Sequence, residues 1–201
     1  MVTVHMLCWD RHSRCLKTPE RSHTMRVYLS GPDVFFPNAM EIGQAKKEIC
    51  ARFGLEGVYP LDADFSGLLQ MSHPADVGYA SFRLMVRLMD SCDLAIANMT
   101  PFRGPSMDVG TAVEIGYMHG CGKPVFGYTN VVADYANRVT PDGFTIEPFG
   151  LIDNCMVEGP VHEAGGVVVR HTAPAGEVYT CLDGFTECVR QAVKLMSTRE
   201  R

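Results

Sequence analysis

Short apolar runs alternate along this chain with longer segments that are apolar on one side only. Five runs have the length and composition of buried strands, at residues 25–30, 58–60, 93–98, 123–128 and 167–170. Helices are predicted between and after them, at residues 38–53, 80–91, 108–120 and 177–197. Strands that alternate with helices are typical of a parallel sheet that is covered on both faces.

The helical segments carry apolar stripes that indicate which side meets the sheet. The stripe of the second helix is predicted to be Phe82, Val86 and Met89, and that of the last helix Leu182, Phe185, Val189 and Val193. Glycine and proline interrupt residues 66–79 and 129–150. These two segments are predicted to be an irregular loop over the site and a long excursion.

The predicted fold class is therefore α/β, with a doubly wound, mainly parallel five-stranded sheet and helices on both faces. This arrangement is Rossmann- or flavodoxin-like, although the chain has no dinucleotide motif. Residues 25–201 have the length of one domain. Residues 1–24 are rich in arginine and lack core periodicity, which favours a disordered or expression-derived extension over a targeting segment.

Composition narrows the class of protein. The chain is 46% apolar and 20% charged, as ordinary soluble proteins are, and no apolar run is long enough to cross a membrane. A net charge of −5 argues against nucleic acid and anionic membranes as partners. The eight cysteines are scattered without zinc-ligand spacing, so we expect reduced thiols in a cytoplasmic protein, with no metal and no cofactor.

The segment from Asp108 to Gly116 carries the strongest chemical signal. Asp108 is predicted to cap the helix that begins there, by accepting hydrogen bonds from the amides of Gly110 or Thr111. Glu114 lies one turn further along, on the same face as Gly110, whose missing side chain leaves room in front of the carboxylate. Small and apolar neighbours favour a nucleophile or base over a surface glutamate.

Other catalytic motifs are absent from the sequence. It has no GxGxxG, no GxxxxGK[ST] and no GxSxG, which disfavours dinucleotide binding, P-loop chemistry and a serine nucleophile elbow. Gly31 and Pro32 follow the first predicted strand, where a glycine-containing turn can cradle a phosphate.

Several motifs, taken together, resemble the nucleoside 2-deoxyribosyltransferase family. They occur in the same order over residues 28–37, 59–62, 93–98, 102–105, 108–114 and 122–125, and Asn154-Cys-Met156 resembles a late Asn-x-Met of the family. The resemblance implies that Glu114 attacks C1′ of a 2′-deoxynucleoside and that Tyr28 steadies this nucleophile. The base leaves, and a second nucleobase then attacks the covalent intermediate with retention of configuration.

The resemblance also implies the residues that bind substrate. Asp108 would hold a sugar hydroxyl, and Asn154 and Met156 would complete the site of a neighbouring subunit in a homo-oligomer. Phe35 and Phe65 would line the base site, with ordinary core positions as the alternative. The remaining candidates for the substrate site are Gly31, Gly110, Asp62 and Asp64.

Two positions leave the reaction open. Met85 stands where the family often has an Asp or Asn, and the Asp is the residue that protonates the leaving base. Either the alignment shifts within this helix, or Asp62, Asp64 or Asp90 substitutes for this acid. Water as the acceptor, in a 2′-deoxyribonucleoside hydrolase, is therefore an alternative. A serine is common at the position of Asp108 in related monophosphate glycosidases, and Ser106 keeps that alternative open. A non-catalytic nucleoside-binding module is the alternative from another class.

Overall fold

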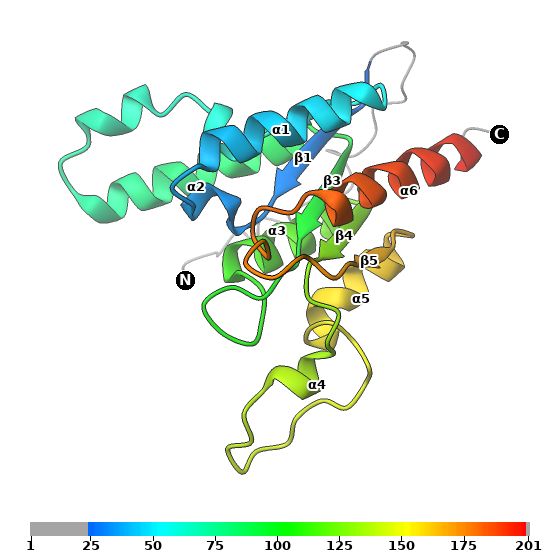
Figure 1. The fold of residues 1–201 in the computed structure, drawn as a ribbon. Helices are drawn as coiled ribbons and strands as arrows, with labels where there is room; N and C mark the ends of the chain where they lie inside the picture. Colours follow the sequence, from blue (N-terminus) through cyan, green and yellow to red (C-terminus); the bar gives the residue numbers. More distant parts are fainter. Residues whose placement is uncertain (1–23, 200–201) are drawn as a thin grey trace, which may run out of the picture.

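The computed structural model describes residues 24–199 and has a parallel sheet at its centre (Figure 1). The strands are β1 (Arg26–Ser30), β2 (Glu56–Val58), β3 (Leu94–Asn98), β4 (Val125–Thr129) and β5 (Val168–Arg170). They lie in the order β2-β1-β3-β4-β5, and every neighbouring pair is parallel. This is the flavodoxin-like order, so the predicted fold class is confirmed.

Helices cover both faces of the sheet (Figure 1). The α-helices are α1 (Ala39–Arg52), α2 (Pro74–Asp90), α3 (Val109–Gly120), α4 (Tyr135–Arg138), α5 (Cys155–Glu163) and α6 (Asp183–Arg199). Short 3-10 helices lie at η1 (Pro32–Phe35), η2 (Pro60–Asp62) and η3 (Ser66–Gln70). Among residues 24–199, no helix has the length and apolar character that a membrane crossing needs.

The sheet separates two hydrophobic cores. Val27 and Leu29 of β1 pack with side chains of α1 and α6, whereas Tyr28 packs with side chains of α2, α3 and α5. Successive side chains of a strand point to opposite faces, which explains the division. Tyr28 and Ser30 therefore lie on the face that carries α3.

The second strand and its surroundings differ from the sequence prediction. The strand was predicted over 58–60, but β2 ends at Val58, because Glu56 to Val58 are the residues that pair with β1. Residues 66–79 were predicted to be irregular, but they contain η3 and the first turn of α2. Proline is favoured in a first helical turn, and the Nδ1 atom of His73 accepts a hydrogen bond from the amide of Ala75.

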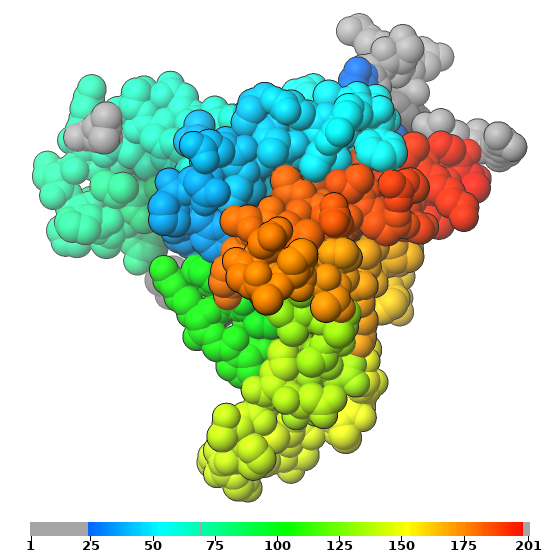
Figure 2. All heavy atoms as spheres, viewed as in Figure 1, coloured from blue at the N-terminus to red at the C-terminus, as the bar shows by residue number. Residues whose placement is uncertain are grey.

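The predicted apolar stripe of α2 is only partly correct. Met89 is buried and Val86 is half-buried, but Phe82 is 60% exposed. The N-terminal part of α2 extends away from the sheet, as Figures 1 and 2 show. The predicted stripe therefore holds only for Val86 and Met89, in the C-terminal half of α2.

The last third of the chain contains elements that the pattern did not predict. α5 has a proline and a glycine inside it, and the excursion over 129–150 contains α4. The last helix begins at Asp183 rather than residue 177. Phe185 and Val189 are fully buried as predicted, whereas Leu182 and Val193 are half-buried. The expectation for residues 1–24 falls, except for residue 24, outside the described residues.

Candidate active site

A cavity lies beside the ends of β1 and β3. The connections that follow these two strands run to opposite faces of the sheet. Open parallel sheets bind ligands at this switch point, at the carboxyl ends of the strands. The cavity has a volume of about 330 Å³. It is lined by Gly31, Val34, Phe35, Pro60, Leu61, Phe65, Ser81, Met85, Asp108, Gly110, Thr111 and Glu114.

Two hydroxyl groups of β1 hold the carboxylate of Glu114. The Tyr28 hydroxyl donates to Oε1 at 2.6 Å, and the Ser30 hydroxyl donates to Oε2 at 2.5 Å. Each carboxylate oxygen is thus fixed by one short, charge-assisted hydrogen bond. The sequence prediction did not assign a role to Ser30, although its place two residues after Tyr28 puts both side chains on one face of the strand.

The surroundings of Glu114 favour a carboxylate that is easily neutralised. Desolvation by burial raises its pKa above the usual range, and the negative charge of Asp108 adds to this effect. The hydrogen bonds from Ser30 and Tyr28 act in the opposite direction. Burial and the nearby Glu114 raise the pKa of Tyr28, so its hydroxyl remains a donor. A partly desolvated carboxylate suits attack on a carbon that carries positive charge.

Asp108 caps α3 as predicted and faces the same cavity. Its Oδ2 atom accepts hydrogen bonds from the amide of Thr111 at 2.9 Å and from the Thr111 hydroxyl at 3.0 Å. Within the described chain Oδ1 makes no hydrogen bond, which leaves it for a donor on a ligand. A Cβ atom on Gly110 would lie 3.0 Å from Oδ2, so glycine leaves room for the capping carboxylate.

A buried polar network forms the floor beneath Gly31. Lys46 and Asp33 form an ion pair at 2.5 Å, and Asn98 donates to the other oxygen of Asp33 at 3.1 Å. A Cβ atom on Gly31 would lie 2.5 Å from the Asp33 carboxylate and 2.8 Å from Asn98. Glycine is therefore required where β1 turns into the cavity wall.

Aromatic rings border the opening of the cavity. The Phe35 ring stacks on Phe102 with 5.8 Å between centroids, and the Arg103 guanidinium lies 5.3 Å from the Phe35 centroid. Phe35 is 55% exposed, which excludes the core position that was its alternative. Phe65 is half-buried and lines the cavity as well. Phenylalanine rings at the rim of a cavity provide an aromatic surface that suits a nucleobase.

The candidate acids Asp62, Asp64 and Asp90 do not line this cavity. Asp62 pairs with Lys47 at 2.7 Å, and the exposed Asp64 accepts a hydrogen bond from the amide of Ser66. Asp90 accepts a hydrogen bond from Tyr117. Met85 does line the cavity, with its sulfur 3.7 Å from the Tyr28 hydroxyl. Among the described lining residues, the carboxylates are thus Asp108 and Glu114.

Asn154 and Met156 also lie outside the cavity of their own chain. Asn154 caps α5 by accepting from the amide of Met156, and its amide group donates to Glu147. Met156 is 78% exposed. Ser106 donates to the buried carboxylate of Asp153 at 2.6 Å, which occupies its hydroxyl in a structural contact.

Taken together, these features define an α/β protein with two carboxylates in a cavity at the switch point of a parallel sheet. The family model of nucleoside 2-deoxyribosyltransferases matches residues 27–156. The chain belongs to the nucleoside 2-deoxyribosyltransferase family, whose members act on nucleosides and nucleobases.

Individual proteins are similar to this chain in sequence or in fold. An uncharacterised protein of Schizosaccharomyces pombe is 36% identical over 168 residues, which cover 71% of this chain and 79% of that protein. The solved structure of a 2-deoxyribosyltransferase from Leishmania mexicana has a TM-score of 0.54 at 22% identity, covering 83% of this chain and 97% of that one. A conserved protein from Enterococcus faecalis has a TM-score of 0.51 at 17% identity, covering 85% and 99% of the two chains. The two solved structures share the fold.

Proposed function

We propose that this protein cleaves the N-glycosidic bond of 2′-deoxynucleosides and transfers the deoxyribosyl group to another nucleobase. The observation that carries the proposal is the Glu114 carboxylate, which faces the cavity and accepts hydrogen bonds from Tyr28 and Ser30. These bonds orient both oxygens through neutral hydroxyl groups, whereas a paired cation would lower their nucleophilicity. Membership of the family supports the same reaction.

The reaction would proceed in two displacements at one carbon. An oxygen of Glu114 bonds to C1′, the C1′–N bond breaks, and its electron pair leaves with the base, which takes up a proton. A nitrogen of the second base then bonds to C1′, and the bond to Glu114 breaks and restores the carboxylate. The second base loses a proton, so no net proton is consumed. Two inversions retain the configuration at C1′.

Asp108 supports nucleosides over nucleotides as substrates. Its free Oδ1 atom is suited to accept a hydrogen bond from a sugar hydroxyl. A 5′-phosphate in the same position would meet a negative charge. Ser106, the residue that would favour a phosphate, is engaged with Asp153.

We further propose that the active form is a homo-oligomer in which Asn154 and Met156 complete the site of a neighbour. α3 and α5 pack against each other, and together they expose Val109 (81%), Val113 (63%) and Met156 (78%). Apolar exposure on adjoining helices supports a contact with a second subunit. Mixing inactive Glu114→Gln with inactive Asn154→Ala should restore activity if sites are shared. No recovery in mixed oligomers would overturn this part of the proposal.

Water as the acceptor is the second candidate, and Met85 is the observation that favours it. A thioether stands in the cavity at the position where the family often has an acid, and a thioether cannot exchange protons with a base. If proton exchange with the acceptor base is slower, water captures a larger share of the covalent intermediate. The deoxyribosyl-enzyme and the role of Glu114 are the same in both candidates.

Product analysis separates these functions. The purified chain is incubated with deoxyinosine, with and without adenine. Formation of deoxyadenosine supports the transferase, whereas free deoxyribose at equal rates in both mixtures would establish the hydrolase. Glu114→Ala should retain nucleoside binding and lose turnover. A wild-type protein that binds deoxynucleosides but turns over none would instead be a binding module.

A further inference from the structure

Three potential metal ligands meet where β5 connects to α6, away from the carboxylate cavity. His171 directly follows β5, Cys181 lies at the end of the connecting segment, and Asp183 opens α6. The Nε2 atom of His171 is 3.5 Å from the Cys181 sulfur. One ligand atom from each of the three residues lies within 4.8 Å of the other two.

The end of β4 holds the backbone of both His171 and Cys181. The amide of His171 donates to the carbonyl of Thr129 at 2.8 Å, which continues the ladder between β4 and β5. The side-chain amide of Asn130 donates to the carbonyl of Cys181 at 2.9 Å. Two ligands fixed on one rigid strand end are preorganised, so little ordering is left for an ion to impose.

Close packing at the start of α6 brings the third ligand to the other two. A Cβ atom on Gly184 would lie 3.0 Å from Cβ of His171 and 3.0 Å from Oδ1 of Asn130. That Asn130 oxygen is buried and has no hydrogen-bond partner among the described residues. Glycine therefore lets the first turn of α6 approach His171, and it leaves a polar atom beside the cluster.

From these contacts we propose that His171, Cys181 and Asp183 bind a divalent zinc-type cation. Thiolate, imidazole and carboxylate are the ligand types of zinc, and tetrahedral bonds to sulfur and nitrogen separate those two atoms by about 3.5 Å. The observed separation of His171 Nε2 and Cys181 Sγ is 3.5 Å. Cys181 is 9% exposed, whereas Asp183 is exposed and can adjust its side chain. Three protein ligands leave one coordination position for water.

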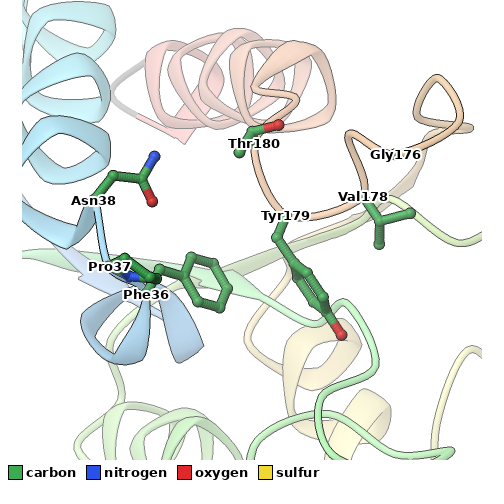
Figure 3. A pocket seen from close by; sticks show the side chains of 7 residues that line it. All are labelled: Phe36, Pro37, Asn38, Gly176, Val178, Tyr179 and Thr180. Atoms are coloured by element: carbon green, nitrogen blue, oxygen red, sulfur yellow. The ribbon is translucent and has the colours of Figure 1, made fainter.

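The ion would tie together the two ends of the segment over 172–180. This segment lines a groove of about 450 Å³ through Val178, Tyr179 and their neighbours (Figure 3). The Tyr179 hydroxyl donates to the carbonyl of Pro101 at 2.8 Å, and its ring centroid is 5.1 Å from that of Phe36. Metal binding would thus stabilise one wall of a groove formed with the residues that follow η1.

Spacing along the chain does not reveal this cluster, and the sequence predicted no metal site. Ten positions separate His171 from Cys181, and only the return of the segment to β4 brings them together. The inference is independent of the reaction proposed for Glu114. Its test therefore needs no assay of turnover.

Cobalt is a suitable probe, because a thiolate bound to Co²⁺ gives an intense charge-transfer absorption. The metal-free full chain is titrated with Co²⁺ alone and then with Zn²⁺. We expect one equivalent of Co²⁺ to produce the absorption and Zn²⁺ to abolish it. Cys181→Ser should remove the absorption, and His171→Ala should weaken Co²⁺ binding by about tenfold or more. Cys155→Ser and His162→Ala, on α5, are matched controls that should leave it unchanged.

Hydrogen exchange gives a second readout, which should not change if Cys181 is a thiol that binds no metal. Zn²⁺ should slow amide exchange over 172–180 in the wild type and leave exchange in Cys181→Ser unchanged. The proposal is overturned if the folded wild type gives no charge-transfer absorption, because the two side chains would then only share a hydrogen bond. It is equally overturned if the absorption survives Cys181→Ser.

Discussion

Replacing Tyr28 by phenylalanine tests how a hydrogen bond from this residue sets the pKa of Glu114. The substitution removes the 2.6 Å hydrogen bond to Oε1 of Glu114 and keeps the ring, which is fully buried. Because this bond favours the charged carboxylate, its loss raises the pKa of Glu114 further. The bond from Ser30 to Oε2 remains in this variant.

The size of the effect follows from the charge on the acceptor. A hydrogen bond to a charged group contributes about 1.5–3 kcal/mol. If it acts only on the ionised form, its removal lowers the ionisation constant of Glu114 by about ten- to a hundredfold. The acid side of the pH profile of kcat/KM should therefore move to higher pH. The deficit of the variant should be largest in acid and shrink as the pH rises.

The assay measures deoxyinosine cleavage across pH for the wild type, Tyr28→Phe and a control. Tyr117→Phe is the matched control, since Tyr117 lies on α3 three residues from Glu114 but donates its hydroxyl to Asp90 at 2.6 Å. The control should keep the wild-type profile. An acid limb that stays in place in folded Tyr28→Phe would refute the reasoning, as would an equal displacement in Tyr117→Phe.

Three further perturbations test separate parts of the account. Burial raises the pKa of Glu114, so the folded protein holds this proton more tightly than the unfolded chain does. Relative to Glu114→Gln, the wild type should gain thermal stability as the pH falls through that pKa and lose it as the pH rises; the opposite slope contradicts the burial argument. Lys46→Met leaves Asp33 as an unpaired buried charge, so the free energy of unfolding, measured by urea denaturation, should fall by about 3–5 kcal/mol. A fall of less than about 1 kcal/mol would show that the ion pair is not needed for stability. Asp108→Ser keeps a capping side chain, so α3 should remain stable while KM rises for deoxyinosine and falls for its 5′-monophosphate. An unchanged ratio of the two KM values would remove Asp108 from substrate selection.

The parts of the fold that pattern could predict are those buried on both sides. Every residue of β3 and β4 is buried, and apolar runs of this kind have few alternative structures. Prediction failed where helix breakers lie inside helices. Pro74 begins α2, where the first turn of a helix tolerates proline. Pro160 lies within α5, where tertiary packing overrides the low helix propensity of proline.

The site was predictable where its residues are close in sequence or share a motif. Asp108 caps α3, and Gly110 and Glu114 lie within it, where a spacing of four residues puts them on one face. The hydrogen bond from Ser30 to Glu114 depends on the packing of β1 against α3, which the spacing of residues along the chain does not encode. The placement of Asp62 and Asp64 outside the cavity depends on the turn at η2 and the contact with Lys47, which no local spacing encodes.

The central claim is that Glu114 forms a bond to C1′ of the sugar, and a trapped intermediate tests it most directly. The wild type is incubated with a slow 2′-fluorinated 2′-deoxynucleoside, digested and analysed by mass spectrometry. We predict that the peptide containing Glu114 gains the mass of the fluorinated sugar, and that Glu114→Gln yields no adduct. Turnover of deoxynucleosides by a wild type that forms no adduct, or an adduct on another residue, would contradict the account.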